Sequence, residues 1–546
     1  MIKHLMSIVL KTIQRISIVY LFFVAGDLSA TATNPSEQID VTEYGFTITL
    51  NDTTNVISGS AEIVFVTKKN TRDFELDLIN SGSDNKGMRV REVTRNGSSL
   101  KFTHENDRLK IYLDKEVIAG STGSVIISYA GVPRDGLIIS QNKFGDRTFF
   151  ANNWPNRGRN WIPVVDHPAD KARVQFAVIA PLHYEVVANG VRQEESYLDN
   201  RQKITRYRQG VPISTKVMVI GVARFAVQRS GVVDHVPVEA WVYPQNREAG
   251  FHDYALAVDI LEYFNKKIGP YPYGKLANVQ SKTTFGGLEN ASAIFYYENS
   301  VTGKAAIQGL VAHEIAHQWF GNSATEKDWQ HVWLSEGFAT YFSLLYDEFK
   351  DGIAARQEKM KEDRRQVIEY NGKTSSPVVV AQVSDPMSML NANSYQKGGW
   401  VLHMLRNEVG DSAFWRGIRN YYATYRDSIA ETEHFRQVME KASGKNLSPF
   451  FNQWLYTAGH PSLKGNWKYN SREKTIELTI WQVQKGQLFD FPLEIAIIGK
   501  DGKGSDIHSL NINKESQTFS LPVAFAPGSV APDPNVNLLF EGELSN

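Results

Sequence analysis

Apolar residues along this 546-residue chain repeat with two different periods, and the change of period divides the chain into three parts. From about residue 39 to 227, short runs alternate apolar and polar positions between breaks of Gly, Asn and Asp, as in residues 46–50, 60–66 and 124–129. A period of two is typical of half-buried strands, so this part is predicted to be all β.

From about residue 237 to 456, apolar residues recur at three- and four-residue intervals instead. This period predicts helices, of which the clearest cover residues 251–268, 305–320, 336–351 and 395–408. The period returns to two after Pro461, where residues 476–481 and 493–498 are predicted strands. We therefore predict a multidomain α+β fold with an N-terminal β domain (36–230), a mainly α domain (231–458) and a small C-terminal β-sandwich (459–546).

The first 30 residues have the pattern of a signal peptide. Four basic or histidine residues within positions 3–15 precede an apolar run at 16–26, which is too short to span a bilayer as a mature helix. Small residues around Ala30 and Ala32 offer cleavage sites. We expect export to a periplasm or the exterior, with no stable membrane span after cleavage; an uncleaved anchor is the alternative.

Composition restricts the chemistry further. Lys and Arg total 59 and Asp and Glu total 59, so net charge gives no support for nucleic acid as a partner. The chain has no cysteine, which excludes disulfides, thiol catalysis and cysteine-bound zinc. Any metal must therefore be held by histidine and carboxylate.

Residues 311–320 read VAHEIAHQWF and place two histidines four positions apart. On a helix, His313 and His317 project from one face and can bind one ion, and Glu314 lies close enough to act as a base without being a ligand. Zinc suits such a pair, because neutral imidazole is a good zinc ligand.

A third ligand is needed, and Glu336 opens the next predicted helix in the stretch WLSEGF. Two histidines and one carboxylate leave the fourth zinc position open for water or substrate. The alternative is that Glu336 only complements the dipole of its helix.

These motifs resemble those of the aminopeptidase N and leukotriene hydrolase family of gluzincins. The HExxH motif, followed after eighteen residues by Glu336, matches the ligand spacing of that family, and residues 286–290 (GGLEN) resemble its Gly-Xaa-Met-Glu-Asn exopeptidase motif. Residues 161–168 (WIPVVDHP) resemble its Phe-Pro-Cys-Phe-Asp-Glu-Pro segment. Further matches fall in family order at residues 271–275, 320–322, 395–398 and 434–438.

The resemblance implies a saddle-like N-terminal β domain, a thermolysin-like catalytic domain and one Zn²⁺ per chain. It implies an aminopeptidase acting on peptides with a free N-terminus, with Glu314 as general base and Tyr395 as hydrogen-bond donor to the oxyanion. The substrate would be bound by Gly286, Gly287, Leu288, Glu289 and Asn290.

Glu289 is the residue expected to recognise the free ammonium group, because a fixed carboxylate near the metal does so electrostatically. Gly286 and Gly287 allow the substrate backbone to approach closely. The preceding residues 277–285 are predicted to form an edge strand along which a peptide could pair.

Two departures from the family are visible. Where relatives place Gln or Glu against the first substrate residue, this chain offers Asn152. Its side chain is shorter and neutral, which affects the preference of the enzyme for the first side chain of the substrate. Only about 85 residues follow Pro461, so the chain is expected to be a short form without the helical C-terminal domain of many relatives.

Two alternative functions stay open on the sequence. One is an endopeptidase, or a di- or tripeptidyl exopeptidase, with the same zinc. The other is a catalytically silent exported peptide-binding protein on the same fold. The presence of Glu289, Glu314 and Tyr395 together argues against the silent protein, since such a relative would be expected to have lost one of them.

Overall fold

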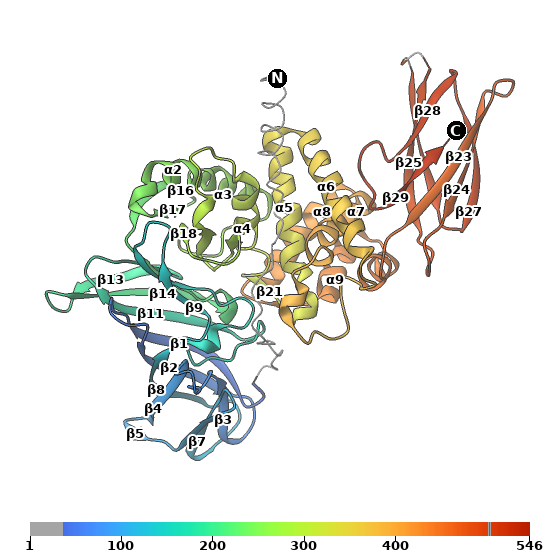
Figure 1. Cartoon of the computed structure of the whole chain (residues 1–546). Coiled ribbons are helices and arrows are strands. Elements are labelled where there is room, and N and C mark those ends of the chain that lie inside the picture. The colour runs from blue at the N-terminus through green and yellow to red at the C-terminus, as the bar shows by residue number, and fades with distance from the viewer. Residues whose placement is uncertain (1–35, 501, 503, 546) are drawn as a thin grey trace.

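The computed structural model describes residues 36–500, 502 and 504–545. The expected signal peptide, residues 1–30, lies outside the described residues. The chain forms a β-rich N-terminal region, a mainly helical middle region and a C-terminal pair of sheets, which lie one after another in space (Figure 1). This arrangement confirms the multidomain α+β fold class.

The N-terminal region consists of strands and two short turns. They are β1 (Ile39–Thr49), β2 (Ile57–Thr67), β3 (Thr71–Asp77), β4 (Gly87–Arg95), β5 (Ser98–Ser99), β6 (Phe102–Glu105), β7 (Arg108–Val117), β8 (Thr122–Val132), β9 (Leu137–Gln141), β10 (Arg147–Ala151), η1 (Gly158–Asn160), β11 (Lys171–Pro181), β12 (Glu185–Ala188), β13 (Val191–Tyr197), β14 (Gln202–Ser214), η2 (Thr215–Val217) and β15 (Ile220–Ala223).

One eight-stranded sheet organises this region, in the order β13-β14-β11-β1-β2-β8-β4-β5. A three-stranded sheet (β3-β7-β6) and a four-stranded sheet (β12-β15-β10-β9) complete it. The strands follow the predicted alternation: Phe46 and Ile48 of β1 are buried, whereas Thr47 between them is half-buried. The predicted strand at residues 46–50 corresponds to the end of the longer β1, which stops at Thr49.

The middle region contains the elements β16 (Ala226–Val233), β17 (Val236–Val242), η3 (Pro244–Asn246), α2 (Arg247–Tyr254), α3 (Leu256–Lys267), β18 (Leu276–Ser281), β19 (Gly287–Leu288), β20 (Ala293–Tyr297), η4 (Glu298–Ser300), α4 (Gln308–Ala316), β21 (Ala324–Glu326), η5 (Trp329–His331), α5 (Trp333–Asp351), α6 (Ile353–Asn371), η6 (Pro386–Met389), η7 (Asn393–Lys397), α7 (Gly398–Val409), α8 (Asp411–Tyr425), β22 (Ser428–Ala430), α9 (Thr432–Ser443), α10 (Ser448–Phe451) and η8 (Asn452–Tyr456). The turns η7 and η8 are π-helical. The predicted domain boundary at 230/231 falls within β16.

A five-stranded sheet in the order β16-β17-β18-β20-β19 opens the middle region. The prediction that residues 277–285 form an edge strand is wrong, because β18 ends at Ser281 and is paired on both sides, with β17 and β20. The edges are β16 and β19, and β19 is formed by Gly287 and Leu288 themselves. Strand order depends on pairing between distant segments, which the local apolar pattern does not encode.

The predicted helices are present with shifted ends. The segment predicted at 251–268 forms α2 and α3, separated by Ala255 alone. The segment predicted at 305–320 is helical only in α4; residues 317–319 continue as turns, and Gly321, which has a left-handed φ of +110°, follows them. The segment predicted at 395–408 begins as the π-turn η7 and continues as α7.

The C-terminal region has two sheets, β27-β24-β23-β29 and β26-β25-β28. Their strands are β23 (Ser462–Asn470), β24 (Thr475–Gln482), β25 (Phe491–Gly499), β26 (Ser505–Ile512), β27 (Ser516–Pro522), β28 (Pro527–Pro532) and β29 (Glu541–Ser545). Buried residues such as Leu478 and Ile495 come from both sheets and fill the space between them. We call residues 457–461, between η8 and β23, the junction.

Two lysines of the N-terminal region, Lys171 (half-buried) and Lys216 (buried), connect it to the middle region. Lys171 of β11 donates from Nζ to the carbonyl oxygens of Asn322 (3.0 Å), Ser323 (2.6 Å) and Ser428 (3.2 Å). Lys216 of η2 forms an ion pair with Glu326 of β21, and both side chains are fully buried. The N-terminal region thus supplies donors to the loop between α4 and α5.

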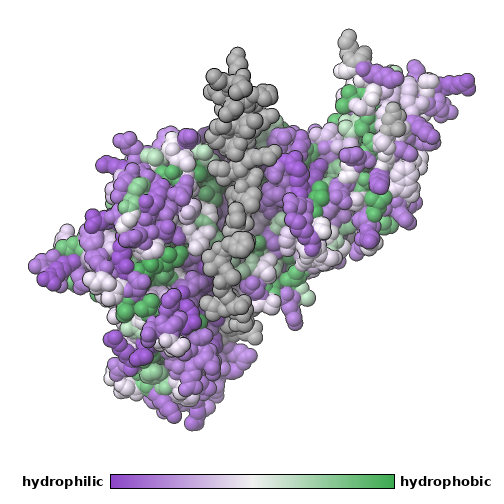
Figure 2. All heavy atoms as spheres, viewed as in Figure 1, coloured by the Kyte–Doolittle hydropathy of each residue, from purple (hydrophilic) through white to green (hydrophobic). Residues whose placement is uncertain are grey.

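Polar residues cover most of the face seen in Figure 2, and apolar residues appear there in small separate areas. Exposed apolar side chains, such as Tyr197 at the end of β13, are ordinary on globular proteins. Within the described part of the chain, no helix combines the length and apolar composition needed to cross a bilayer.

Lys216→Met is expected to destabilise the protein by about 3–5 kcal/mol, because it leaves the buried Glu326 carboxylate without its partner. The double variant Lys216→Met/Glu326→Met should recover most of this loss, since two apolar side chains need no charge balance. Urea unfolding followed by tryptophan fluorescence measures both. If the double variant is at least as unstable as the single one, the buried charge is not what stabilises this interface.

Candidate metal centre and substrate anchor

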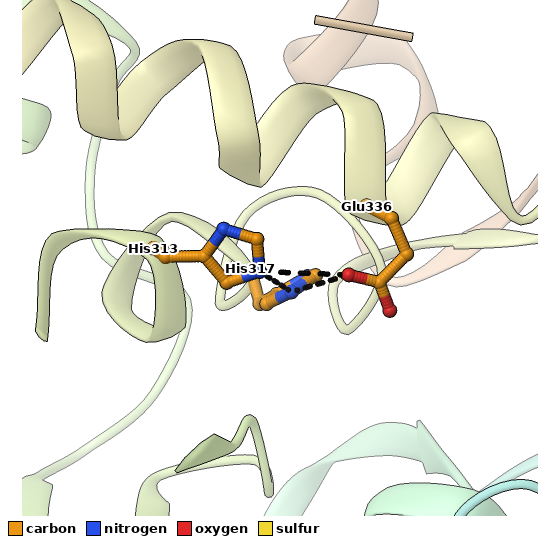
Figure 3. Close-up of side chains that lie close together, drawn as sticks. All are labelled: His313, His317 and Glu336. Carbon is orange, nitrogen blue, oxygen red and sulfur yellow. Dashed lines mark hydrogen bonds and ion pairs between the residues drawn. The ribbon is translucent and has the colours of Figure 1, made fainter. Parts of the chain in front are cut away.

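The two histidines of the HExxH motif lie at the end of α4. His313 occupies the last turn, and His317 is the residue that follows the helix, with helical dihedral angles (φ −56°, ψ −26°). Because His317 continues the helical path, its side chain falls on the same face as that of His313. Glu336 lies in the first turn of α5, as the sequence predicts, and its side chain reaches toward both imidazoles (Figure 3).

The three side chains converge on one point. The Nε2 atoms of His313 and His317 are 3.1 Å apart, and Oε2 of Glu336 lies 3.5 Å and 3.2 Å from them (Figure 3). Ligand atoms around a tetrahedral zinc ion, each at about 2.0–2.1 Å from it, are separated by about 3.3 Å. The three atoms therefore have the separation that a shared metal ion requires.

The surroundings of Glu336 also fit a cation. Its Oε2 atom is buried and lies within ion-pair distance of both imidazoles, without a hydrogen bond of good geometry to either. A buried carboxylate carries a desolvation cost that a bound cation offsets. The donor set of two imidazoles and one carboxylate is one that zinc and related divalent ions accept.

Electrostatics within the cluster favour one shared proton. Burial lowers the pKa of His313, whereas for His317 the Glu336 carboxylate outweighs burial and raises the pKa to about 9. Burial opposes the charge of Glu336, but the two imidazoles lower its pKa well below the usual range. A metal ion binding here must displace that proton, so affinity is expected to fall as pH decreases.

A second layer of contacts fixes the orientation of His317. Its Nδ1 atom lies 3.2 Å from the carbonyl oxygen of Phe320 and 3.0 Å from Oγ of Ser335. A proton held on Nδ1 toward Phe320 leaves Nε2 free to bind a metal. Gly321 makes this packing possible, because a Cβ at that position would lie 2.1 Å from the Ser335 hydroxyl.

Glu314 lies beside the cluster and is buried. Burial raises its pKa well above the usual range; Glu289 and Glu336 add to this effect, while His317 opposes it. The carboxylate packs against the backbone of Gly287, where a Cβ would lie 2.2 Å from Oε1 of Glu314. A carboxyl group with a raised pKa in this position is suited to accept and return a proton.

Glu289 is the third buried carboxylate. Its charge influences the pKa values of His313, Glu314 and His317, which places it beside the cluster. Its Oε1 atom is buried and has no hydrogen-bond partner among the described residues. A buried, unpaired acceptor next to a metal centre is suited to bind a cationic group of a ligand.

Two residues to which the sequence assigned no role, one of them in the matching segment 320–322, hold Glu289 in place. Gln318 donates from Nε2 to the carbonyl oxygen of Glu289 at 2.8 Å, and Asn322 donates from Nδ2 to the same oxygen at 2.6 Å. Both lie shortly after the HExxH motif, in the run HQWFGN. This proximity to the motif is the sequence signal that could have identified them.

The other residues of the GGLEN motif form the sheet edge beside Glu314. Gly287 and Leu288 make up β19, and Leu288 is buried. Gly286 precedes them, and its carbonyl oxygen accepts a hydrogen bond from the amide of Tyr297. Asn290 is fully buried, and neither polar atom of its side chain has a hydrogen-bond partner among the described residues.

Tyr395 lies next to His313, with ring centroids 6.0 Å apart and ring planes 5° apart. It is half-buried and belongs to the π-turn η7. The approach of this turn to α5 depends on two glycines, since a Cβ on Gly337 would lie 2.8 Å from Cα of Gly398. The residue after Glu336 therefore contacts the helix that continues from Tyr395.

Asn152 is brought beside the loop that precedes Gly286, but its side chain is engaged there. Its Nδ2 atom donates to Oγ1 of Thr284 at 3.1 Å, and its Oδ1 atom accepts from Oγ1 of Thr283 at 3.3 Å. In this arrangement Asn152 supports the loop, and a direct contact with substrate stays a prediction.

Two family models match the chain in the regions that build this site. Residues 41–217 match the Peptidase M1 N-terminal domain, and residues 253–454 match the Peptidase family M1 domain. The chain belongs to peptidase family M1. This confirms the resemblance drawn from the sequence motifs, and M1 is a metallopeptidase family, in agreement with the cluster of His313, His317 and Glu336.

Curated relatives that this M1 chain matches are longer. Probable aminopeptidase 1 of Saccharolobus solfataricus is 26% identical over 82% of this chain and 57% of its own length. Aminopeptidase A of Gloydius brevicauda is 27% identical over 69% of this chain and 41% of its own length. Glutamyl aminopeptidase of Sus scrofa is 27% identical over 57% of this chain and 34% of its own length. The alignments thus span a third to three fifths of these M1 relatives.

Ser335→Ala is expected to weaken metal binding roughly 10- to 100-fold, because it removes a side chain that orients the ligand His317. Ser335 is not a ligand, so the variant should still bind one ion per chain at saturating metal. Competition with a chromogenic chelator measures the affinity, and Ser343→Ala, which alters a serine further along α5, is the matched control. Equal affinities in Ser335→Ala and wild type would show that the Phe320 carbonyl alone orients the ring.

Proposed function

We propose that this protein is a zinc-dependent aminopeptidase that removes single residues from the N-terminus of peptides. The observation that carries the proposal is the buried, unpaired Oε1 atom of Glu289 beside the His313–His317–Glu336 cluster. An endopeptidase has no need of an unpaired carboxylate there, whereas an enzyme that selects a free N-terminus needs an acceptor for its ammonium group.

His313, His317 and Glu336 would hold one zinc ion. When bound, the ion supplies a Lewis acid that polarises the scissile carbonyl group and lowers the pKa of water. The imidazole and carboxylate donors are suited to zinc, and the contacts of His317 Nδ1 with Ser335 and the Phe320 carbonyl would leave Nε2 available to the ion.

The remaining residues would bind the substrate and move the proton. The peptide backbone would pair with the β19 edge, and the Glu289 carboxylate would accept hydrogen bonds from the α-ammonium group. This contact would fix the position of the peptide so that a single N-terminal residue is removed. Glu314 would take a proton from the attacking water and deliver it to the leaving amine. The Tyr395 hydroxyl would donate a hydrogen bond to the carbonyl oxygen as negative charge develops on it.

The setting that we propose for this activity is outside the cytoplasm. The support is the signal-like pattern of residues 1–30 in the sequence. The names of several relatives refer to aminopeptidases with different side-chain preferences, and the preferred first residue of this chain is not part of the proposal.

Glu314→Gln is expected to lower kcat by roughly 10²–10⁴-fold, because an amide of the same shape cannot accept the proton. Zinc content and melting temperature should stay close to wild type. The assay is release of a fluorophore from aminoacyl substrates, with zinc measured on the same preparation. Near-normal turnover in this variant would require another general base.

Glu289→Gln tests the substrate anchor with no change of shape. The variant should raise KM for free-amine substrates roughly 10- to 100-fold, because a charge-assisted contact is replaced by a neutral one. Wild type should hydrolyse N-acetylated versions of the same substrates far more slowly, and the variant should reduce this discrimination. If wild type cleaves acetylated and free peptides equally well, the protein is an endopeptidase; if it only binds them, the silent peptide-binding protein is correct.

A further inference from the structure

The turn that carries Tyr395 ends in a buried lysine. Lys397 occupies the last position of η7, and its side chain is fully buried. Its Nζ atom donates a hydrogen bond to the carbonyl oxygen of Gly459 at 2.7 Å. Burial lowers the pKa of Lys397 to about 7, and both the ammonium and the neutral amine can donate in this contact.

The acceptor belongs to the junction between the middle and C-terminal regions. Gly459 has a left-handed φ of +83°. Next to it, Nδ1 of His460 lies 3.2 Å from Nδ2 of Asn371, at the end of α6. The carbonyl oxygen of Pro461 accepts a hydrogen bond of 3.0 Å from the amide of Glu541, at the start of β29. The junction is therefore held by elements on both sides.

Burying a lysine at this position costs free energy, so its contact is expected to have a role. Burying an amine requires a partner, and a methionine of similar length would fill the space without that requirement. The turn itself is a π-turn, a geometry that is rare and is concentrated at functional sites. Its other anchors lie within the middle region: Asn393 donates to the carbonyl oxygen of Ser376 at 2.8 Å, and Gly398 packs against Gly337.

We propose that Lys397 is a positioning residue that ties the Tyr395 turn to the junction at Gly459, so that the C-terminal region helps to set the position of the Tyr395 hydroxyl. This inference rests on the proposed role of Tyr395 in the aminopeptidase reaction. It assigns the C-terminal region a part in catalysis without any contact between that region and the substrate.

The test is a double-mutant cycle between Lys397→Met and Tyr395→Phe. Lys397→Met should lower kcat roughly 10- to 100-fold with KM nearly unchanged, because a displacement of about 1 Å in a catalytic group has that effect. If Lys397 acts through the Tyr395 hydroxyl, the same substitution in the Tyr395→Phe background should change kcat by less than about twofold. An equal loss in both backgrounds would overturn the proposal.

Two further variants separate this role from general stability. Lys397→Gln keeps an N–H donor at slightly shorter reach and should retain more activity than Lys397→Met. Arg364→Met is the matched control: Arg364 of α6 donates to the carbonyl oxygen of Leu538 at 2.6 Å, so it also joins the middle region to the C-terminal region. It should lower the melting temperature and leave kcat of the folded protein unchanged.

Hydrogen exchange gives a readout that does not depend on turnover. Amides of residues 393–397 should exchange faster in Lys397→Met and at the wild-type rate in Arg364→Met. If exchange in η7 is the same in Lys397→Met as in wild type, the contact between Lys397 and Gly459 does not hold the turn in place. The inference is then wrong, whatever the activity. If wild type lacks turnover while exchange responds as expected, the proposed function fails and the structural tie stands.

Discussion

Three glutamates are buried together at the candidate site, and each has different surroundings that bear on its charge. Glu336, Glu314 and Glu289 are 3%, 5% and 5% exposed. Like charges in a medium of low dielectric cannot all stay ionised without compensation. Glu336 faces two imidazoles and the proposed ion, Glu314 has a raised pKa and can hold a proton, and Glu289 has an oxygen free for an ammonium group. In the proposed reaction, the substrate's ammonium group would supply the positive charge that Glu289 lacks.

Close packing of backbone keeps these charged groups in contact. Gly287 lets β19 press against Glu314, and Gly321 lets the turn after His317 accommodate Ser335. Gly337 and Gly398 let α5 and η7 cross one residue away from Glu336. Each of these positions would place a Cβ closer than 3 Å to a neighbouring atom, so the geometry of the site is set largely by residues without side chains.

The sequence predicts the local part of this structure well. Strand and helix periods locate the regions, the four-residue spacing places His313 and His317 on one face, and Glu336 opens its helix as expected. These features depend on neighbours in the chain. Strand order depends instead on pairing between distant segments. For that reason the sequence prediction puts the segment of β18 at an edge, which β19 occupies in the structure. Element boundaries also shift, as in α4, which ends at Ala316 where the helical period predicts residue 320.

The other features that the sequence does not predict are side-chain directions and buried polar contacts. Lys171, Lys216 and Lys397 read as surface residues, because lysine is almost never fully buried, yet all three reach acceptors in another segment of the chain. Family resemblance places Asn152 in the right neighbourhood but not the direction of its amide, which is bonded to Thr283 and Thr284. Gln318 and Asn322 gain their role only when β19 folds back over α4.

The length of β19 has a consequence for association between molecules. A site that receives an extended peptide along a sheet needs an unpaired edge, and unpaired edges invite the strands of other chains and aggregation. Here the edge consists of Gly287 and Leu288 alone, and Glu289, directly after it, is a buried carboxylate. Two residues can align the first bonds of a peptide, but they offer too few hydrogen bonds to capture a strand of another chain. The β19 edge is thereby open to the proposed ligand and too short to pair stably with a strand of another chain.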